Sequence, residues 1–145
     1  MNKKRYKPGD TKVVNGEKLY FERYIGYKKL DGSQSGRWKD WDSFLETRIK
    51  QSIRKYKRRD NDFNLDLKYL KAIYPKDSKC PVSLEKMKFG NTDRRNSPSL
   101  DRLDNSRGYV EGNVAWVCDR INLLKGDLTL VQLKALLNYI DQGER

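Results

Sequence analysis

Charge is distributed unevenly along this chain. Residues 1–79 contain 22 Lys and Arg against 11 Asp and Glu, whereas residues 80–145 contain 10 and 9. The second half is therefore balanced like an ordinary folded unit, and the excess belongs to the region before it. Neutralising phosphates releases counterions and drives association, so the first half is expected to contact a polyanion. A solvated basic surface without a partner is the alternative.

Length and residue usage limit the class of protein further. The 145 residues suffice for one compact domain, or for a small core with an extended arm. Two cysteines supply neither a disulfide framework nor a four-thiolate zinc site. No apolar run approaches the ~20 residues of a membrane span, and the start leads into no signal-peptide core. Histidine, the commonest general base and metal ligand, is absent.

Residues 1–40 are predicted to form a basic arm and a short β-hairpin. Residues 1–10 are polar and basic and indicate a flexible arm. Strand-prone residues 12–14 and 19–21 flank Asn15-Gly16, a dipeptide typical of tight hairpin turns. Residues 24–27 predict a further short strand before a polar loop at 31–36.

Residues 41–79 are predicted to be a basic helical region. Apolar residues recur at steps of three and four between Trp41 and Tyr56, which predicts a helix over 41–58. A shorter helix follows Asn64 and ends at Pro75. Cations stabilise a helix C-terminus, but so many without an acid favour a phosphate-facing helix. The nucleic-acid-binding residues predicted here are Arg48, Lys50, Arg54, Lys55, Lys57, Arg58 and Arg59.

Residues 80–145 are predicted to form the folded C-terminal unit. Strands over 99–103 and 113–118, joined by a wide loop, precede a helix over 119–125. Asp119 is the expected N-cap of that helix, and Gly126 is placed to end it. Thr129 and Gln132 have the spacing of a capping box for a last helix. Its expected buried face comprises Leu133, Leu136, Leu137 and Ile140.

The strand–loop–strand–helix stretch is the part of the sequence that can hold a metal ion. A hairpin with a helix laid across its strands brings Asp101 beside Asn122, although the two are far apart in sequence. One carboxylate and one amide oxygen make a magnesium site when water and phosphate fill the other positions. Asn122 is unfavourable in mid-helix, which points to a function for it. In the alternative interpretation Asp101 and Asp104 are surface turn residues paired with Arg102 and Arg107.

Three segments carry a resemblance to a known family. They read SPSLDRLD at 97–104, GYVEGNV at 108–114 and DRINLLK at 119–125. Together they resemble the ββα-metal module of HNH endonucleases, especially small phage-type members, over residues 80–125. The resemblance implies an α+β fold in which this HNH-like module has flanking helices and a basic N-terminal extension. It also implies cleavage or nicking of double-stranded DNA with Mg²⁺ or Mn²⁺, inside a prokaryotic host cell and without a membrane partner.

By this resemblance each site residue has a role. Asp101 and Asn122 would be the metal ligands, and Asn113 would brace the loop. The histidine base of the family is replaced by Arg102, whose guanidinium is a poor base but a good phosphate ligand. Asp104 is the nearest alternative for taking a proton or orienting water.

Other residues complete the expectations. Four basic residues near the site in sequence would join the grip on phosphate: Arg94, Arg95, Arg120 and Lys125. Cys80 and Cys118 are expected to be small buried residues, with no structural zinc. The three tryptophans, Trp38, Trp41 and Trp116, are expected core anchors, with base stacking a lesser alternative for Trp38. The rival functions are DNA binding without catalysis and RNA binding.

Overall fold

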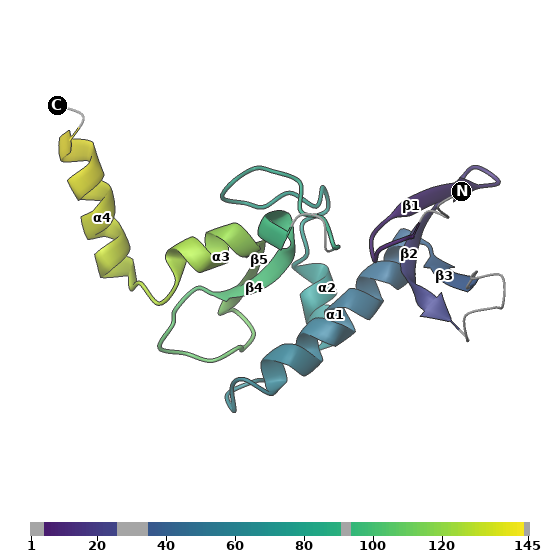
Figure 1. Ribbon diagram of the computed structural model, residues 1–145. Coiled ribbons are helices and arrows are strands. Elements are labelled where there is room, and N and C mark those ends of the chain that lie inside the picture. The colour runs from purple at the N-terminus through teal and green to yellow at the C-terminus, as the bar shows by residue number, and fades with distance from the viewer. Residues whose placement is uncertain (1–4, 26–34, 91–93, 144–145) are drawn as a thin grey trace.

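The chain has an α+β fold built from two small antiparallel sheets and four helices in its described part (Figure 1). The computed structural model describes residues 5–25, 35–90 and 94–143. The N-terminal sheet lies at one end of the long helix α1, and the second sheet lies beside the other helices. Helix α4 extends away from the rest (Figure 1).

The N-terminal sheet contains β1 (Thr11–Val14), β2 (Glu17–Ile25) and β3 (Ser35–Lys39) in that order. Val14 pairs with Glu17, so Asn15 and Gly16 form a two-residue turn, both with positive φ. This confirms the predicted hairpin, because left-handed φ values at both positions suit Asn-Gly. The strand predicted at 24–27 is the end of β2 as far as Ile25; its last two residues lie outside the described residues. The third strand of the sheet, β3, begins at Ser35, inside the predicted loop 31–36, and continues to Lys39.

The predicted flexible arm is wrong for the part of residues 1–10 that can be described. Tyr6 packs against the rings of Phe21 and Trp38, with ring centroids 5.7 and 4.9 Å apart. The backbone N–H of Gly9 donates to the carbonyl of Phe21 at 2.9 Å. Aromatic packing and a backbone hydrogen bond therefore tie this segment to the sheet, which its polar composition did not indicate.

Helix α1 (Trp41–Lys57) confirms the predicted helix to within one residue. The side chain of Asp40 caps its first turn by accepting from the N–H of Ser43. Its apolar stripe is buried at Phe44, Leu45, Ile49 and Tyr56. Helix α2 (Leu67–Ala72), capped by Asp66, packs against α1 and ends before Pro75.

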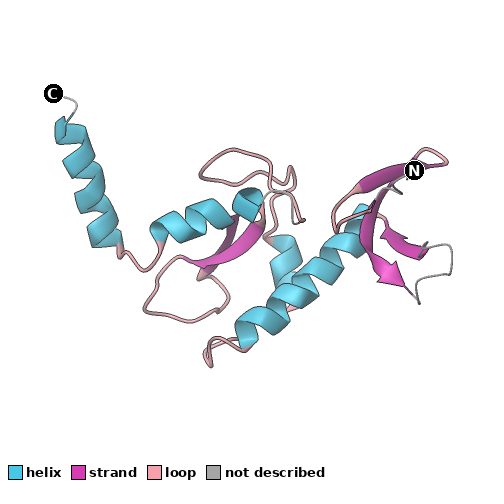
Figure 2. Cartoon of the chain, in the orientation of Figure 1, coloured by secondary structure: helices cyan, strands magenta, loops and turns pink. Residues whose placement is uncertain are grey.

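The C-terminal sheet pairs β4 (Pro98–Arg102) with β5 (Val114–Cys118), and α3 (Asp119–Lys125) follows directly (Figure 2). A short 3-10 helix, η1 (Arg94–Asn96), precedes β4. Trp116 lies in the main core, and its indole N–H donates to the carbonyl of Leu70 at 3.0 Å. The core therefore joins the predicted basic helical region to the C-terminal unit, so the two are not separate domains.

The expected tryptophan anchors divide between two places. Trp116 is 2% exposed and Trp41 packs against the main core. Trp38 is half-buried in the N-terminal sheet, where its ring meets Phe21 edge-on at 5.2 Å. Lys12 lies 4.4 Å above the Trp38 ring. Trp38 is thus an anchor of the small sheet.

The N-cap expected at Asp119 is wrong. Cys118 occupies the N-cap position without a side-chain capping bond, and Asp119 is the first helical residue. The backbone N–H of Asp119 donates to the carbonyl of Ser97 at 2.8 Å, so β4 and its approach satisfy this end of the helix. Gly126 ends α3 as predicted, with φ of 53°.

The buried face expected for the last helix is wrong. The capping box is present, since Thr129 and Gln132 exchange hydrogen bonds at 2.8 and 3.3 Å. However, α4 (Leu130–Gly143) contains no buried residue, and Leu136, Leu137 and Ile140 are 46–66% exposed, while Leu133 is half-buried. The described residues place no second element over this face. None of the helices described is long and apolar enough to cross a bilayer.

Candidate functional site

Asn122 joins α3 to the middle of β4. Its side-chain N–H₂ donates to the hydroxyl of Ser99 at 2.9 Å and to the carbonyl of Leu100 at 3.2 Å. Both bonds use the nitrogen, so the amide oxygen remains available as an acceptor. Leu100 directly precedes Asp101, and α3 therefore carries Asn122 to the residue next to the predicted carboxylate ligand.

Lys125 contacts Asp101 directly. Its ammonium lies 2.9 Å from the carboxylate, and it also donates to the backbone carbonyl of Arg102. The side chain of Asp101 is 10% exposed and that of Lys125 is 17% exposed. A charge this buried requires a partner, so a cation beside Asp101 is part of the folded structure. Asp101 is therefore not a surface turn residue.

Arg102 is held on the outside of β4 by two groups. Its guanidinium lies 3.4 Å from the carboxylate of Asp60, just after α1, and 5.3 Å from the centre of the Tyr109 ring. Partial burial raises the pKa of Tyr109, so its hydroxyl is protonated at neutral pH. The Arg102 side chain is 32% exposed, which leaves part of the guanidinium facing solvent.

Asn113 spans the loop between β4 and β5. It is 1% exposed, and its side-chain nitrogen donates to the carbonyls of Asp104 and Gly108, both at 3.0 Å. Its side-chain oxygen accepts from the N–H of Asp104 at 3.0 Å. A buried amide with all these partners fixes the two ends of the loop relative to each other.

Asp104 lies on this loop and is exposed. Its carboxylate accepts from the hydroxyl and the N–H of Ser106, at 2.7 and 2.8 Å. These two bonds lower the pKa of Asp104, with smaller contributions from Arg107 and Lys125 against a small opposing effect of burial. Asp104 is therefore ionised at neutral pH, and a lowered pKa makes it a weaker proton acceptor.

The loop is docked on the segment that follows α1. The carboxylate of Asp62 accepts from the N–H of Gly108 at 3.0 Å, and a Cβ on Gly108 would lie 2.1 Å from the carbonyl oxygen of Asp62. Glu111 N–H donates to the side chain of Asn64 at 2.9 Å. Only glycine permits this approach at position 108. Asp60 and Asp62 are not recognisable as site residues in the sequence, because nothing local pairs them with residues over 40 positions away.

Tyr56 connects the basic end of α1 to the same strand. Its hydroxyl lies 3.1 Å from that of Ser99 and accepts from the N–H of Leu100 at 3.2 Å. The predicted phosphate ligands around it are exposed, with their charged ends outside the core: Lys50, Arg54, Lys55, Lys57, Arg58 and Arg59. The strand carrying Asp101 and the basic end of α1 are thereby fixed relative to each other.

The remaining predicted phosphate ligands lie in different surroundings. Arg94 and Arg95 are exposed on η1, which packs beside α3. Arg120 is partly exposed and pairs with Glu85 at 3.3 Å. Arg48 is instead mostly buried, with its guanidinium 5.1 Å from the Phe44 ring, and this burial lowers its pKa. Arg48 is thus placed to pack, whereas the arginines of η1 face solvent.

The cysteines are buried as expected, at 0% and 1% exposure for Cys80 and Cys118. The N–H of Cys118 donates to the sulfur of Cys80 at 3.3 Å. Burial raises the pKa of the Cys80 thiol, but hydrogen bonds from Ser83, Cys118 and Val82 outweigh it and lower the value to about 7. Across residues 5–25, 35–90 and 94–143, no cluster of three or more His, Cys, Asp or Glu side chains could hold a metal ion.

The donor set around Asp101 nevertheless fits a hard divalent cation. Mg²⁺ is commonly held by one or two protein oxygens, with water and substrate phosphate completing its shell. The carboxylate of Asp101 and the amide oxygen of Asn122 are oxygens of this kind. The neighbouring ammonium of Lys125 also indicates that positive charge is favourable at this position.

Comparisons with known proteins identify one phage relative. The chain is 39% identical over 90 residues to a protein of Enterobacteria phage T4 described as an uncharacterized 29.0 kDa protein in the dda-modA intergenic region. The match covers 61% of this chain and 35% of that protein, so the chain spans about a third of its length. No protein-family model matches the chain, and no solved structure matches it.

Proposed function

We propose that the chain is a metal-dependent endonuclease that nicks or cleaves double-stranded DNA through a histidine-less HNH-like site. The resemblance of residues 80–125 to the ββα-metal module supplies the reaction class. The order of β4, β5 and α3 supports it, because this is the arrangement that the resemblance implies. The similarity to a phage protein supports action inside a prokaryotic host cell.

One observation carries the proposal. Asn122 donates to the carbonyl of Leu100, and Lys125, on the same face of α3, contacts the carboxylate of Asp101. Asn122 and Lys125 follow their partners in β4 by more than twenty residues, yet α3 brings an amide to Leu100 and a cation to the buried carboxylate of Asp101. An unfavourable mid-helix Asn and a buried Asp are difficult to explain as surface residues.

The residues around this carboxylate have separate tasks in the reaction. Asp101 and Asn122 would hold a Mg²⁺ or Mn²⁺ ion, which when bound supplies positive charge to the scissile phosphate and the leaving oxygen. Arg102 binds a non-bridging phosphate oxygen through the exposed part of its guanidinium. Asp104 orients the attacking water, and Asn113 keeps the loop that carries Asp104 in place.

The basic end of α1 holds the DNA beside this site. Its exposed cations follow one another from Arg54 to Arg59, and Tyr56 fixes this segment to β4. Contacts to phosphate position a duplex without reading its sequence, so binding has little sequence preference. Arg94 and Arg95, exposed on η1 beside α3, would add further phosphate contacts.

The proposal is tested by nicking of a supercoiled plasmid with Mg²⁺, with Mn²⁺ and with a chelator. Asp101→Ala and Asn122→Ala should reduce the rate more than a hundredfold, because each removes a metal ligand, whereas binding to the same plasmid in a gel shift should persist. Asp141→Ala, an exposed carboxylate on α4, is the matched control and should nick at the original rate. Equal rates in all variants would exclude the assigned ligands.

A specific observation favours the second candidate, a DNA-binding protein without catalysis. Lys125 already neutralises Asp101, and Arg102 is already paired with Asp60, so both charges have partners without metal or substrate. In that case the plasmid stays intact with either metal while the gel shift remains. Competition between duplex DNA and duplex RNA at fixed salt tests the third candidate, RNA binding, which predicts stronger competition by RNA.

A further inference from the structure

A hollow of about 740 Å³ lies between the N-terminal sheet and the chain that leads to η1. Its walls come from the segment 8–11, from β2, from the first turn of α1 and from residues 76–89. No residue assigned to metal, catalysis or phosphate binding in the proposed function lines it. Its size is that of a small-molecule or nucleotide site.

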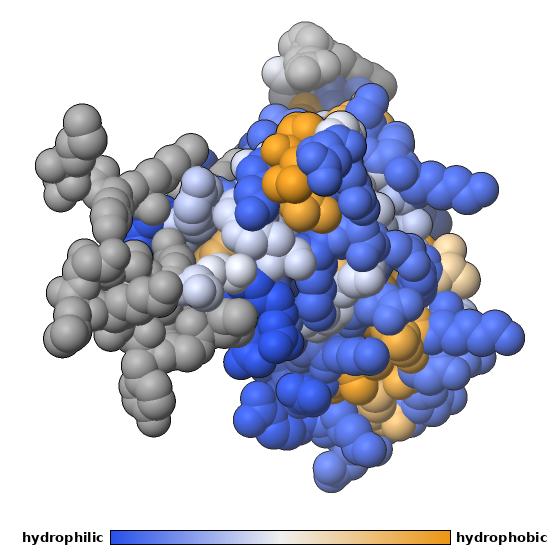
Figure 3. Space-filling model, turned by 90° about the vertical axis from the view of Figure 1, so that its right-hand side faces the viewer, coloured by the Kyte–Doolittle hydropathy of each residue, from blue (hydrophilic) through white to orange (hydrophobic). Residues whose placement is uncertain are grey.

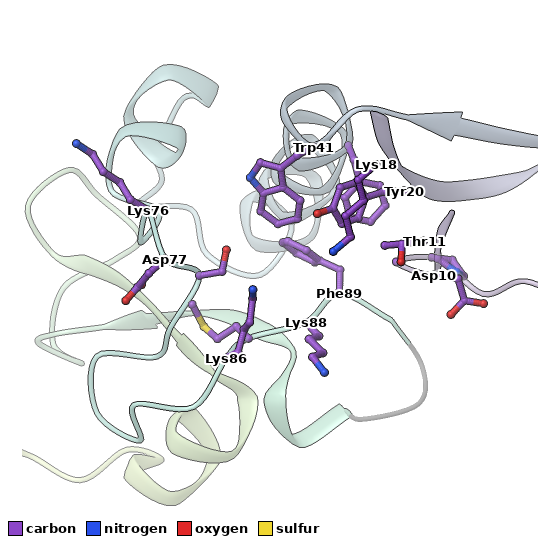
Figure 4. Close-up of a pocket in the computed structure, with 15 residues that line it drawn as sticks. Asp10, Thr11, Lys18, Tyr20, Trp41, Lys76, Asp77, Lys86, Lys88 and Phe89 are labelled. Carbon is purple, nitrogen blue, oxygen red and sulfur yellow. The ribbon is translucent and has the colours of Figure 1, made fainter. Parts of the chain in front are cut away.

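Aromatic rings form one side of the hollow. Tyr20, Trp41 and Phe89 are half-buried, with ring centroids 5.0 Å apart for Tyr20 and Trp41 and 6.5 Å apart for Trp41 and Phe89. Phe44 lies buried beneath them, stacked on Tyr20 at 5.4 Å. These rings pack against one another on one side and are open to the hollow on another side. Figure 4 shows this for Tyr20, Trp41 and Phe89.

Four lysines also line the hollow. Lys18, Lys76, Lys86 and Lys88 line the hollow together with Asp10 and Asp77, an excess of positive charge. In Figure 4 the ammonium groups of Lys18 and Lys86 extend from opposite walls toward the Phe89 ring. Among the described residues these four lysines have no carboxylate partner, and the ammonium of Lys18 lies 5.7 Å from the centre of the Tyr20 ring.

At one wall of the hollow, the backbone at Gly9 approaches the backbone at Phe89 closely. Gly9 has φ of 93°, and a Cβ there would lie 1.8 Å from the carbonyl oxygen of Phe89. Only glycine allows this contact, which sets the distance between the segment carrying Asp10 and the segment carrying Phe89. The hollow is thus a shaped feature of the packed structure.

We propose that this hollow binds an unpaired nucleotide of single-stranded DNA. A base is a flat aromatic group that stacks on tyrosine, tryptophan and phenylalanine regardless of its identity. The phosphates on either side of a base are anions that lysine ammonium groups bind, and their contact releases counterions. A purely apolar ligand would leave the lysines unused, and a phosphate alone would leave the rings unused.

The position of the hollow relates it to the other DNA contacts. Trp41 begins α1 and Lys57 ends it, so about 24 Å of helix separate the hollow from the basic end beside Arg102. This distance corresponds to about seven nucleotides along one strand of a duplex. One molecule of DNA can therefore occupy both places, with a paired region at α1 and an unpaired one at the hollow. That arrangement rests on the proposed function, whereas binding at the hollow does not.

The test uses fluorescence anisotropy of a labelled ten-residue thymidine oligonucleotide in a chelator, where no cleavage occurs. The double variant Lys18→Ser, Lys86→Ser should bind about tenfold more weakly. The salt slope, which is the slope of the logarithm of the binding constant against the logarithm of the salt concentration, should fall in magnitude by about 1.4, because two phosphate contacts are lost. Lys68→Ser with Lys134→Ser removes equal charge from exposed sites elsewhere and should stay within twofold. Equal losses in both pairs would overturn the proposal.

Intrinsic fluorescence tests the stacking. The oligonucleotide should quench the protein's tryptophan emission, and Trp41→Phe should remove that quenching while keeping a ring in place, because Trp38 and Trp116 do not line the hollow. Unchanged quenching in Trp41→Phe would overturn the assignment. Equal affinity for the same thymidine oligonucleotide paired with its complement would overturn it as well, and so would tighter binding of the corresponding uridine oligoribonucleotide. Because binding is measured without metal, a plasmid that remains intact bears only on the nuclease proposal.

Discussion

The two sheets of this protein are stabilised by different kinds of side-chain contact. Aromatic contacts hold the N-terminal sheet, in which Phe21 packs against both Tyr6 and Trp38. In the unit of β4, β5 and α3, the polar residues Ser99, Asp101 and Asn113 are buried instead, and each has a hydrogen-bond or ion-pair partner. Seen from the side of the N-terminal sheet, the surface is mainly hydrophilic with separate apolar patches (Figure 3).

The two regions differ in how closely their side chains are held in position. Ring stacking tolerates adjustment, whereas a buried polar group destabilises the fold unless each partner is in place. The β4–β5–α3 unit is therefore the part in which buried polar side chains have fixed positions, as the proposed catalysis would require. In the proposals above, the N-terminal half would contribute charge and flat aromatic surfaces for contact with a polyanion.

The largest expected effect is loss of the amide that braces the loop between β4 and β5. Asn113→Ala removes three hydrogen bonds. The N–H of Asp104 loses its acceptor, whereas the carbonyls of Asp104 and Gly108 keep the backbone N–H groups of Arg107 and Val110 as donors. One unpaired donor costs about 1–3 kcal/mol and each of the other two lost bonds contributes about 0.5–1.5 kcal/mol, so the free energy of unfolding should fall by about 3–4 kcal/mol. Urea denaturation measures it.

The matched control for this variant is Asn61→Ala, which truncates an exposed asparagine near the same loop. It should change the free energy of unfolding by less than about 0.5 kcal/mol. Equal losses in the two variants would mean that the buried amide of Asn113 stabilises the fold no more than an exposed one. The proposed difference between the two sheets would then be wrong.

The next largest effect concerns charge on the other side of the comparison. Changing Arg54, Lys57 and Arg58 together to Gln removes three exposed cations from the end of α1 without touching its buried stripe. The salt slope of duplex binding should fall by about 2.7, and affinity at 0.15 M salt should fall about a hundredfold. Filter binding across a salt series measures both quantities.

Stability separates this variant from Asn113→Ala. The midpoint of urea denaturation should move little, because none of the three charges is buried. A large loss of stability would show that the cations at the end of α1 support the fold, as the helix dipole alone would suggest. An unchanged salt slope would remove this segment from the DNA-binding surface.

Local signals in the sequence predicted the elements well. Asn15-Gly16 specified its hairpin, and Gly126 and the Thr129–Gln132 pair marked helix ends, because the atoms involved lie within a few residues of each other. The two strands before α3 follow from the same kind of signal, whereas the α+β class is an implication of the family resemblance. Register and turn chemistry are properties of short segments, so a sequence displays them directly.

Contacts between distant segments were not predictable in the same way. Lys125 was expected to hold phosphate and instead contacts Asp101, while Arg102 meets Asp60, 42 residues earlier. The apolar stripe of α4 was taken for a buried face, but periodicity shows only that a helix is amphipathic and not that another element covers it. Such pairings depend on how elements pack, which no local pattern records.

The smallest expected effect concerns Asp104, an exposed carboxylate of the β4–β5–α3 unit. It tests whether hydrogen bonds set the pKa of a side chain in this unit even where that side chain is exposed. Ser106→Ala removes the hydroxyl donor to Asp104, so the pKa of Asp104 should rise toward the ordinary aspartate value. A lowered pKa contributes stability that is present above the ordinary value near ~4 and is lost as pH falls through the lowered one. Carboxyl ¹³C shifts measured by NMR during an acid titration should therefore place the midpoint higher in Ser106→Ala than in the original protein. Ser52→Ala, on the surface of α1, should leave it unmoved, and a midpoint equal in all three proteins would mean that Ser106 does not control this carboxylate.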